Sequence, residues 1–338
     1  MIHTRGLAHL YRSGRGRNRR EVRAVDGVDL DVRPGEIVGL LGPNGAGKTT
    51  TMRMLTTSLR PTGGTAVVAG HDVVREPAQI RRRIGYVSQS GGVSSMARAG
   101  HEVVDRGLLY GGRSRDVEPR ARRLFAELDI EGLWDRTPRE MSGGQRRRLD
   151  LAMGLIHRPD LVLLDEPTSG LDPQSRANLW QHVRRLRAEH ETTVLLTTHY
   201  LDEADALCDR IVVVDAGHVI ADDTPDALKA SVAGDLVDVG VLDPRDADRA
   251  AAVLAAAGPL HGATVEVDGA RVRRRIPRAA TEIPGITRAL QDHGIVLASL
   301  EVRRPTLEDV FLSLTGRSLR EDGAQPLAVE PEPVGVSS

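Results

Sequence analysis

The sequence is poor in cysteine and carries no excess charge of either sign. Cys208 is the only cysteine in 338 residues, which excludes an intrachain disulfide and a cysteine-rich metal site and is typical of a reducing compartment. Lys plus Arg is 46 and Asp plus Glu is 47. A dedicated nucleic-acid-binding protein depends on excess positive charge, so we expect no nucleic-acid partner, although a local basic patch is compatible with this balance.

Long apolar runs are also missing. The first residues lack the apolar segment of a secretory signal, and no stretch approaches the roughly 18 consecutive apolar residues of a membrane span. We therefore expect a chain that does not cross a bilayer by itself. Aromatic residues make up 2% of the sequence, and only Lys48 and Lys229 are lysines. A lysine or an aromatic residue in so biased a chain is therefore a candidate for closer attention.

The pattern of apolar runs predicts an α/β fold. At about 150 residues per domain, the length indicates one large or two modest domains, and 40% hydrophobic residues suffice for a core. Short apolar runs separated by helical patterns predict buried parallel strands at 36–41, 84–87, 161–165, 192–197 and 211–215. Alternating segments at 2–9 and 22–32 predict an antiparallel sheet, with a polar arginine-rich loop at 12–20 between them.

Two further regions depart from this core. Residues 92–158 show no good strand and predict an all-helical insertion, for example helices at 118–128 and 145–157. From residue 233 the order is βαββαβ, with strands at 235–242, 264–267, 271–276 and 295–302 and helices at 245–257 and 283–293, which fits a ferredoxin-like plait. A last helix is expected at 306–314, and the tail 317–338 is expected to be disordered.

A glycine-rich segment follows the first parallel strand and matches the phosphate-binding pattern G-x-x-x-x-G-K-[ST]. It comprises Gly42, Pro43, Asn44, Gly45, Ala46, Gly47, Lys48, Thr49 and Thr50. Glycines let backbone N–H groups ring the phosphates, and the following helix adds a partial positive charge. We expect Lys48 to contact the β- and γ-phosphates and Thr49 to ligate Mg²⁺. The alternative is an ordinary glycine-rich turn.

Two acids end the apolar strand 161–165. Such a strand end is where open α/β sheets bind ligands. We expect Asp165 to hold Mg²⁺ directly or through water, and Glu166 to orient the attacking water or accept its proton. Taken alone, two acids after a strand also occur in solvated turns.

A second candidate anion site lies at Ser142, Gly143, Gly144 and Gln145. Ser142 is a good N-cap, and the glycines expose N–H groups at a helix start. One ATP does not need two phosphate cradles in one chain, so this site fits a nucleotide held by another subunit. The alternative is a plain capped helix.

These motifs, with 169–172 and Thr198-His199, stand in the order and spacing of the ATP-binding-cassette (ABC) ATPases, and the resemblance covers about residues 1–230. It implies that Tyr11 stacks on adenine, that Gln89 contacts Mg²⁺ and the water, that Asp172 crosses a dimer interface, and that His199 reaches the γ-phosphate.

The sequence departs from the family pattern in two places. Met141 replaces the usual Leu, a swap of similar volume, and 90–95 is unusually small and polar, which leaves the shape of the coupling segment open.

The segment 303–316 resembles the ending of ATP-binding subunits similar to the daunorubicin-resistance exporters, in which a separate membrane subunit forms the pore. Here Leu307, Val310, Phe311 and Leu314 share one helix face. That face could contact a partner or pack on the chain itself. The arginine-rich residues 12–23 could touch anionic lipid or form a solvated loop.

The sequence thus predicts an ABC-type P-loop cassette over residues 1–232, with an antiparallel β-subdomain and a helical subdomain at 92–158, and a small α+β domain over 233–316. The resemblance implies ATP and Mg²⁺ as cofactors, a second copy in a head-to-tail nucleotide-sandwich dimer, and a separate integral membrane permease. It implies a peripheral position on the cytoplasmic side of the membrane and export of a drug-like or lipid substrate. A soluble ribosome- or DNA-associated ABC ATPase and an ABC importer subunit remain the alternatives.

Overall fold

The computed structural model describes residues 1–13, 20–92, 96–232, 234–256, 265–277 and 279–316. Within them the chain divides into two compact units, Met1–Pro225 and Asp226–Arg317, which are treated separately below. The sequence placed this boundary at 232/233, after helix α8 (Pro225–Ser231) rather than at its start. Part of the arginine-rich loop, and the tail 317–338, lie outside the described residues.

A six-stranded sheet forms the centre of the first unit. Its order is β10 (His218–Asp223), β9 (Arg210–Asp215), β3 (Ile37–Leu41), β8 (Thr193–Thr198), β7 (Leu161–Asp165) and β6 (Ile84–Val87). All neighbours are parallel except β9 and β10. Every residue of β3, β7 and β8 is buried, which is why these strands read as continuous apolar runs. The predicted parallel core is confirmed.

A four-stranded antiparallel sheet lies on one side of this core, in the order β2 (Arg20–Val32), β1 (Ile2–Ser13), β4 (Gly63–Val68) and β5 (His71–Asp72). The first two strands extend further than predicted into the arginine-rich segment. Arg12 pairs with Glu21 across the strands, with 3.1 Å between Nε and Oε1, so opposite charges replace apolar alternation in holding this part of the ribbon. Strands β4 and β5 and helix α2 (Pro77–Arg83) were not predicted.

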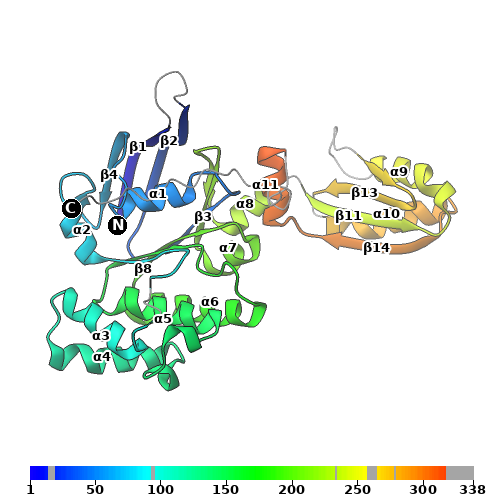
Figure 1. The fold of residues 1–338 in the computed structure, drawn as a ribbon. Coiled ribbons are helices and arrows are strands. Elements are labelled where there is room, and N and C mark those ends of the chain that lie inside the picture. The colour runs from blue at the N-terminus through cyan, green and yellow to red at the C-terminus, as the bar shows by residue number, and fades with distance from the viewer. Residues whose placement is uncertain (14–19, 93–95, 233, 257–264, 278, 317–338) are drawn as a thin grey trace. The chain divides into compact units, whose positions relative to one another are not determined.

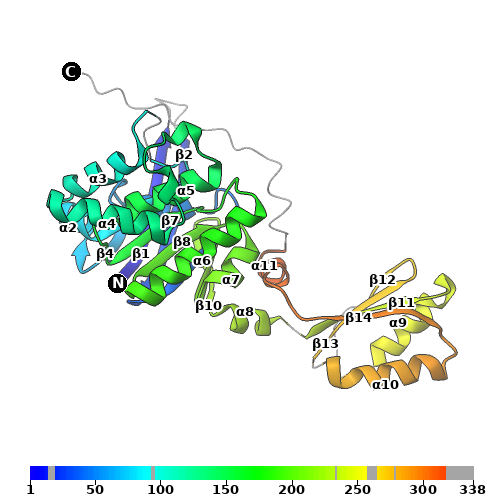
Figure 2. The same ribbon diagram turned by 90° about the horizontal axis from the view of Figure 1, so that it is seen from below.

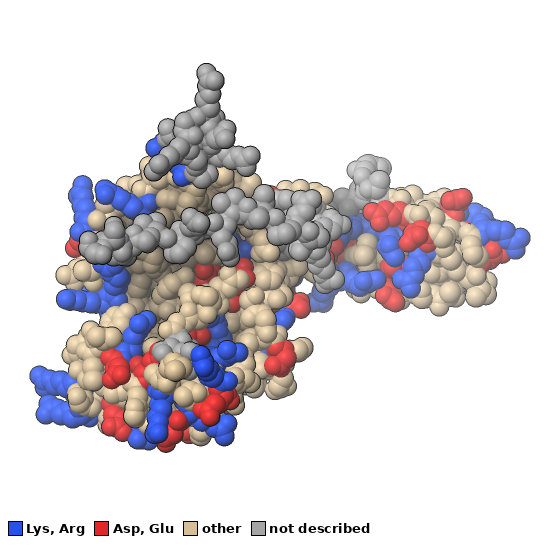
Figure 3. Space-filling view, in the orientation of Figure 1, with Lys and Arg blue, Asp and Glu red and all other residues tan. Residues whose placement is uncertain are grey.

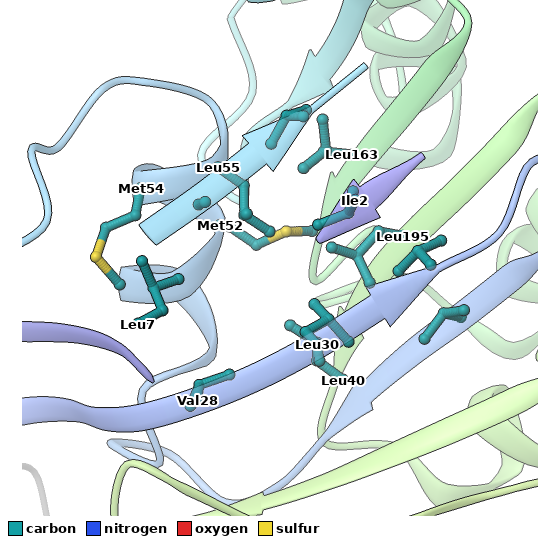
Figure 4. Packing of buried hydrophobic residues seen from close by; sticks show 14 of the residues in the cluster. Ile2, Leu7, Val28, Leu30, Leu40, Met52, Met54, Leu55, Leu163 and Leu195 are labelled. Carbon is teal, nitrogen blue, oxygen red and sulfur yellow. The ribbon is translucent and has the colours of Figure 1, made fainter. Parts of the chain in front are cut away.

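Helix α1 (Lys48–Leu55) lies between the two sheets (Figure 1). Met52 and Leu55 are fully buried among side chains from both sheets, including Ile2, Leu30 and Leu195 (Figure 4). This packing fixes the first turn of α1, which follows the glycine-rich loop.

Helices cover the other side of the six-stranded sheet (Figure 1). They are α3 (Ala99–Leu109), α4 (Ser114–Glu127), α5 (Gly143–Leu155), α6 (Pro173–His190) and α7 (Leu201–Leu207). The described part of 92–158 contains helices and 3₁₀ turns and no strand, as predicted. On the face drawn in Figure 3, side chains of both signs are interspersed over α3 to α5.

The second unit is an antiparallel sheet covered on one face by two helices. The strand order is β12 (Glu266–Asp268), β13 (Arg271–Ile276), β11 (Asp235–Val241) and β14 (Leu297–Arg303). Helices α9 (Ala247–Ala256) and α10 (Ala279–Asp292) pack on it through one apolar cluster, and Figure 2 shows α10 running alongside this sheet. The predicted βαββαβ order is confirmed.

Helix α11 (Leu307–Thr315) ends the described chain. On its predicted apolar face Leu307, Val310 and Phe311 are buried, whereas Leu314 is 44% exposed. Most of that face is therefore already covered by the chain itself.

Candidate nucleotide-binding and hydrolysis site

The glycine-rich loop joins the end of β3 to the start of α1, and Gly45 and Gly47 in it have positive φ. Gly47 has φ +100°, and a Cβ there would lie 2.4 Å from the carbonyl oxygen of Ala24, so only glycine fits. Glycine also offers no side-chain cap, which leaves the first-turn N–H groups of α1 for an anion. The glycine-only position and the uncapped start of α1 are features that suit phosphate binding.

Lys48 lies inside this loop and is 5% exposed. Its Nζ donates to the carbonyl oxygens of Gly42 at 2.6 Å and Pro43 at 2.9 Å. Burial lowers the pKa of the ammonium, and the nearby charges of Glu166 and Asp165 act in the opposite direction. The ammonium is thus a buried point charge at the loop.

Asp165 ends β7 and gathers hydroxyl groups from three elements. Its Oδ1 accepts from Thr49 Oγ1 at 3.2 Å and from Thr197 Oγ1 at 2.6 Å, and its Oδ2 accepts from Tyr86 at 3.5 Å. Burial first, and then the Asp165 charge, raises the pKa of Tyr86 to about 12, so this phenol remains a donor. The predicted pair of Thr49 and Asp165 is brought together.

Glu166 has φ +43°, a left-handed conformation that costs a non-glycine residue about 1–3 kcal/mol. Three residues that the sequence singled out for other contacts surround its carboxylate. Gln89 Nε2 donates to Oε2 at 2.9 Å, His199 Nδ1 lies 3.4 Å from Oε1, and Lys48 Nζ lies 3.9 Å from Oε1. Backbone strain at this position thus accompanies a cluster of polar side chains.

Burial alone would raise the pKa of Glu166. The imidazole of His199, 3.4 Å from the carboxylate, and the charge of Lys48 outweigh burial and hold the pKa of Glu166 below its usual value. The carboxylate is therefore ionised and ready to accept a proton.

Tyr11 lies on β1 opposite Val22 of β2. The carbonyl of Ala24, two residues along β2, borders Gly47 of the loop. Tyr11 also packs edge-on against His9, with ring centroids 4.5 Å apart. The aromatic ring thus lies on the sheet that flanks the loop.

Ser142 and Asp172 are exposed and cap helices in this chain. Ser142 Oγ accepts from the N–H of Gln145 at 3.3 Å, and Gln145 Oε1 accepts from the N–H of Ser142 at 2.9 Å, a capping box. Asp172 accepts from the N–H of Ser175 at 2.9 Å and from its hydroxyl at 2.6 Å, and these bonds lower the pKa of its carboxyl. Gly143 and Gly144 form the first turn of α5 after that cap.

The sequence did not single out Tyr86, Thr197 or Arg147. Thr197 could have been found, because it is a polar residue near the end of an apolar strand and pairs in register with Asp165. Tyr86 has a similar position near the end of β6. Arg147 is the middle one of three consecutive arginines, and the sequence alone does not show which of the three is buried.

The oxygen atoms of Thr49 and Asp165 fit a hard cation. No group of three or more His, Cys, Asp and Glu side chains that could hold a metal occurs among the described residues. Mg²⁺ commonly takes only one or two carboxylates and completes its shell with phosphate oxygens and water. One carboxylate and one hydroxyl beside a phosphate loop suit that chemistry.

Comparison with known proteins assigns the family. Residues 25–169 match the family described as ABC transporter. Daunorubicin resistance ATP-binding protein DrrA3 of Streptomyces coeruleorubidus is 46% identical over 298 residues, which cover 88% of this chain and 93% of that protein. This chain belongs to the ABC transporter family. It is an ATP-binding subunit and an ATPase.

Other ABC proteins are also similar to this chain. Daunorubicin/doxorubicin resistance ATP-binding protein DrrA of Streptomyces peucetius is 40% identical over 331 residues, 97% of this chain and 96% of that protein. A dimeric ATP-binding cassette solved in a post-hydrolysis state with ADP and phosphate is 25% identical, with a TM-score of 0.61, and covers 66% of this chain and 98% of that one. Across the described residues, no helix combines the length and apolarity needed to cross a membrane.

Proposed function

We propose that this ABC ATPase powers export of a drug-like or lipid substrate through a separate membrane permease, from the cytoplasmic side of the membrane. The names of the relatives support the drug class, and their match extends over the second unit as well as the cassette. The proposal assigns ATP hydrolysis to this chain and the transport path to its partner.

The nucleotide is held by the loop and by Lys48. Loop N–H groups and the buried ammonium of Lys48 bind the β- and γ-phosphates. On binding, Lys48 exchanges its hydrogen bonds to the carbonyl oxygens of Gly42 and Pro43 for contacts with the phosphates. Thr49, Asp165 and Gln89 would hold Mg²⁺, which neutralises charge developing on the phosphates. The ring of Tyr11 would stack on adenine.

Glu166 is the general base. It is ionised, and it lies within reach of the groups that would orient water and the γ-phosphate, Gln89 and His199. Lys48 places positive charge beside it, which stabilises negative charge on the transferred group.

Two copies close head to tail, so that each nucleotide contacts the phosphate loop of one chain and the Ser142 segment of the other. Ser142 is exposed at the first turn of α5, a helix terminus that favours an anion. Asp172, exposed at the start of α6, is available to the same interface.

The convergence of Lys48, Gln89 and His199 on Glu166 carries this proposal, and the variant Glu166→Gln tests it. The variant should bind ATP but hydrolyse it about 10²–10⁴-fold more slowly, because the amide keeps the shape and loses the proton acceptor. Size exclusion should show an ATP-stabilised dimer. The control Lys48→Ala should lose both nucleotide binding and the ATP-dependent dimer. Hydrolysis by Glu166→Gln within a few-fold of wild type would remove Glu166 from the role of base.

A further inference from the structure

The short segment Ser88–Gly92, which carries Gln89, is held at both ends by helix α5. Arg147 Nη1 donates to the carbonyl oxygen of Ser88 at 2.6 Å. Asp150 Oδ1 accepts from the N–H of Gly92 at 2.9 Å. Arg147 and Asp150 lie one helical turn apart and are both less than one-tenth exposed, with 3.9 Å between Nη1 and Oδ2. We call these two side chains the α5 clamp.

The composition of the segment suits the clamp. Ser88 Oγ donates to the carbonyl oxygen of Gly91 at 2.9 Å, and the N–H of Gly91 donates back to the carbonyl oxygen of Ser88 at 3.1 Å, which closes a tight turn. Gly91 has φ +76°, and a Cβ there would lie 3.0 Å from Asp150 Oδ2. Small residues therefore let the turn approach the buried carboxylate.

Arg147 also reaches both sides of Glu166. Its Nη2 donates to the carbonyl oxygen of Asp165 at 3.0 Å, and its Nε donates to that of Pro167 at 2.7 Å. A planar guanidinium can serve three carbonyls at once, which an ammonium on a flexible stem cannot match in geometry. One side chain of α5 thus fixes the backbone around Glu166 and the backbone before Gln89.

We infer that Arg147 and Asp150 are positioning residues that keep Gln89 against Glu166. The inference rests on the proposed roles of Glu166 and Gln89. Helix α5 is capped by Ser142, so a shift of this helix on contact with a second chain would move the clamp and with it the Gln89–Glu166 pair. The clamp gives the Ser142 segment a direct mechanical connection to the base.

The Asp150 variants carry the test. Alanine and asparagine both remove the charge that faces Arg147, so the comparison between them isolates the acceptor for the Gly92 N–H. Asp150→Ala removes the acceptor for the Gly92 N–H, and kcat should fall about tenfold or more, since small misplacements of catalytic groups are costly. KM for ATP should stay within about threefold, because the phosphate loop is unchanged. Asp150→Asn keeps an acceptor oxygen and should retain kcat within about threefold.

A double-mutant cycle with Gln89→Ala separates positioning from general stability. If the clamp acts through Gln89, Asp150→Ala should change kcat less than about twofold in the Gln89→Ala background. Equal losses in both backgrounds, or equal losses for Asn and Ala at 150, would overturn the inference. Failure of the proposed function would show differently, as undiminished hydrolysis by Glu166→Gln.

Arg147→Lys and Arg147→Gln extend the test to the residues around Glu166. Both should lower kcat more than they raise KM for ATP, with lysine the milder change because it can keep one of the three carbonyl bonds. Arg81→Gln, at an exposed position on α2, removes the same charge and should leave both constants unchanged. Parallel rises in KM without loss of kcat would contradict a positioning role.

Discussion

Adjacent carboxylates at the end of β7 have different surroundings. Asp165 accepts from hydroxyl groups, whereas Glu166 faces a lysine, a histidine and an amide. The turn in the backbone at Glu166, with φ +43°, separates the two environments. The sequence singled out both acids, Thr49 beside Asp165 and the three side chains around Glu166, but it missed Thr197 and Tyr86. It could not predict the strain, because a left-handed glutamate is stabilised only by contacts from distant elements.

His199 keeps Glu166 acidic, which makes the pH dependence of hydrolysis testable at one residue. In His199→Ala the close approach of the imidazole is lost while burial remains, so the pKa of Glu166 should rise. A base must be ionised to work, so the acidic limb of the kcat profile should move to higher pH than in wild type. Measuring kcat of His199→Ala and of wild type from acidic to neutral pH checks this shift.

The matched control is His218→Ala. His218 is exposed on β10 and faces Asp26, with Nε2 3.7 Å from Oδ2, outside the site. Its removal should leave the acidic limb in place. An unchanged limb in His199→Ala would mean that His199 does not set the ionisation of Glu166.

At the scale of elements, the apolar pattern predicted those strands whose residues are fully buried. Strands β3, β7 and β8 are buried on both faces, so their sequences leave little ambiguity. The short strands β4 and β5 were missed, because β4 is partly exposed and β5 has only two residues. Strands β1 and β2 were predicted too short, since a charge pair rather than apolar alternation extends them.

Helix α11 offers a comparison between two apolar residues on one predicted face. Phe311 is 1% exposed and Leu314 is 44% exposed. Phe311→Ala should lower the free energy of unfolding by about 3–5 kcal/mol, because it removes a large buried ring. Leu314→Ala should change it by less than about 1 kcal/mol. Urea denaturation followed by circular dichroism measures both.

If α11 contacts a partner, Leu314 should matter more for function than Phe311, although it matters less for stability. If Leu314 contacts the permease, Leu314→Ala should weaken co-purification with membranes while stability and basal hydrolysis stay unchanged. Similar destabilisation by both variants would mean that Leu314 is covered in solution.

At the scale of the whole molecule, the chain carries two helix starts that we propose as anion sites, at Lys48 and at Gly143. The composite-site proposal predicts that Ser142→Arg and Lys48→Ala are each inactive as homodimers. The arginine occupies the space of the γ-phosphate and removes the cap of α5. In a mixed head-to-tail dimer, one site carries both lesions and the other carries neither.

Mixing the two inactive proteins should therefore restore ATP hydrolysis, provided that chains exchange and one intact site suffices. Titrating one variant into the other at fixed total concentration should give a maximum near equal amounts. Activity of Ser142→Arg alone at high dilution, where it is monomeric, would show instead that each chain completes its own site.

The scarcity of lysine has a practical consequence for separating the two units. Lys48 is 5% exposed inside the phosphate loop, whereas Lys229 lies in α8, close to the division between the units, with its side chain 24% exposed. A lysine-specific protease acts where the backbone can open locally. Mild digestion should therefore cut after Lys229 and spare Lys48. One cut would release residues 1–229 with the complete phosphate loop, and a second fragment that holds the whole βαββαβ sheet.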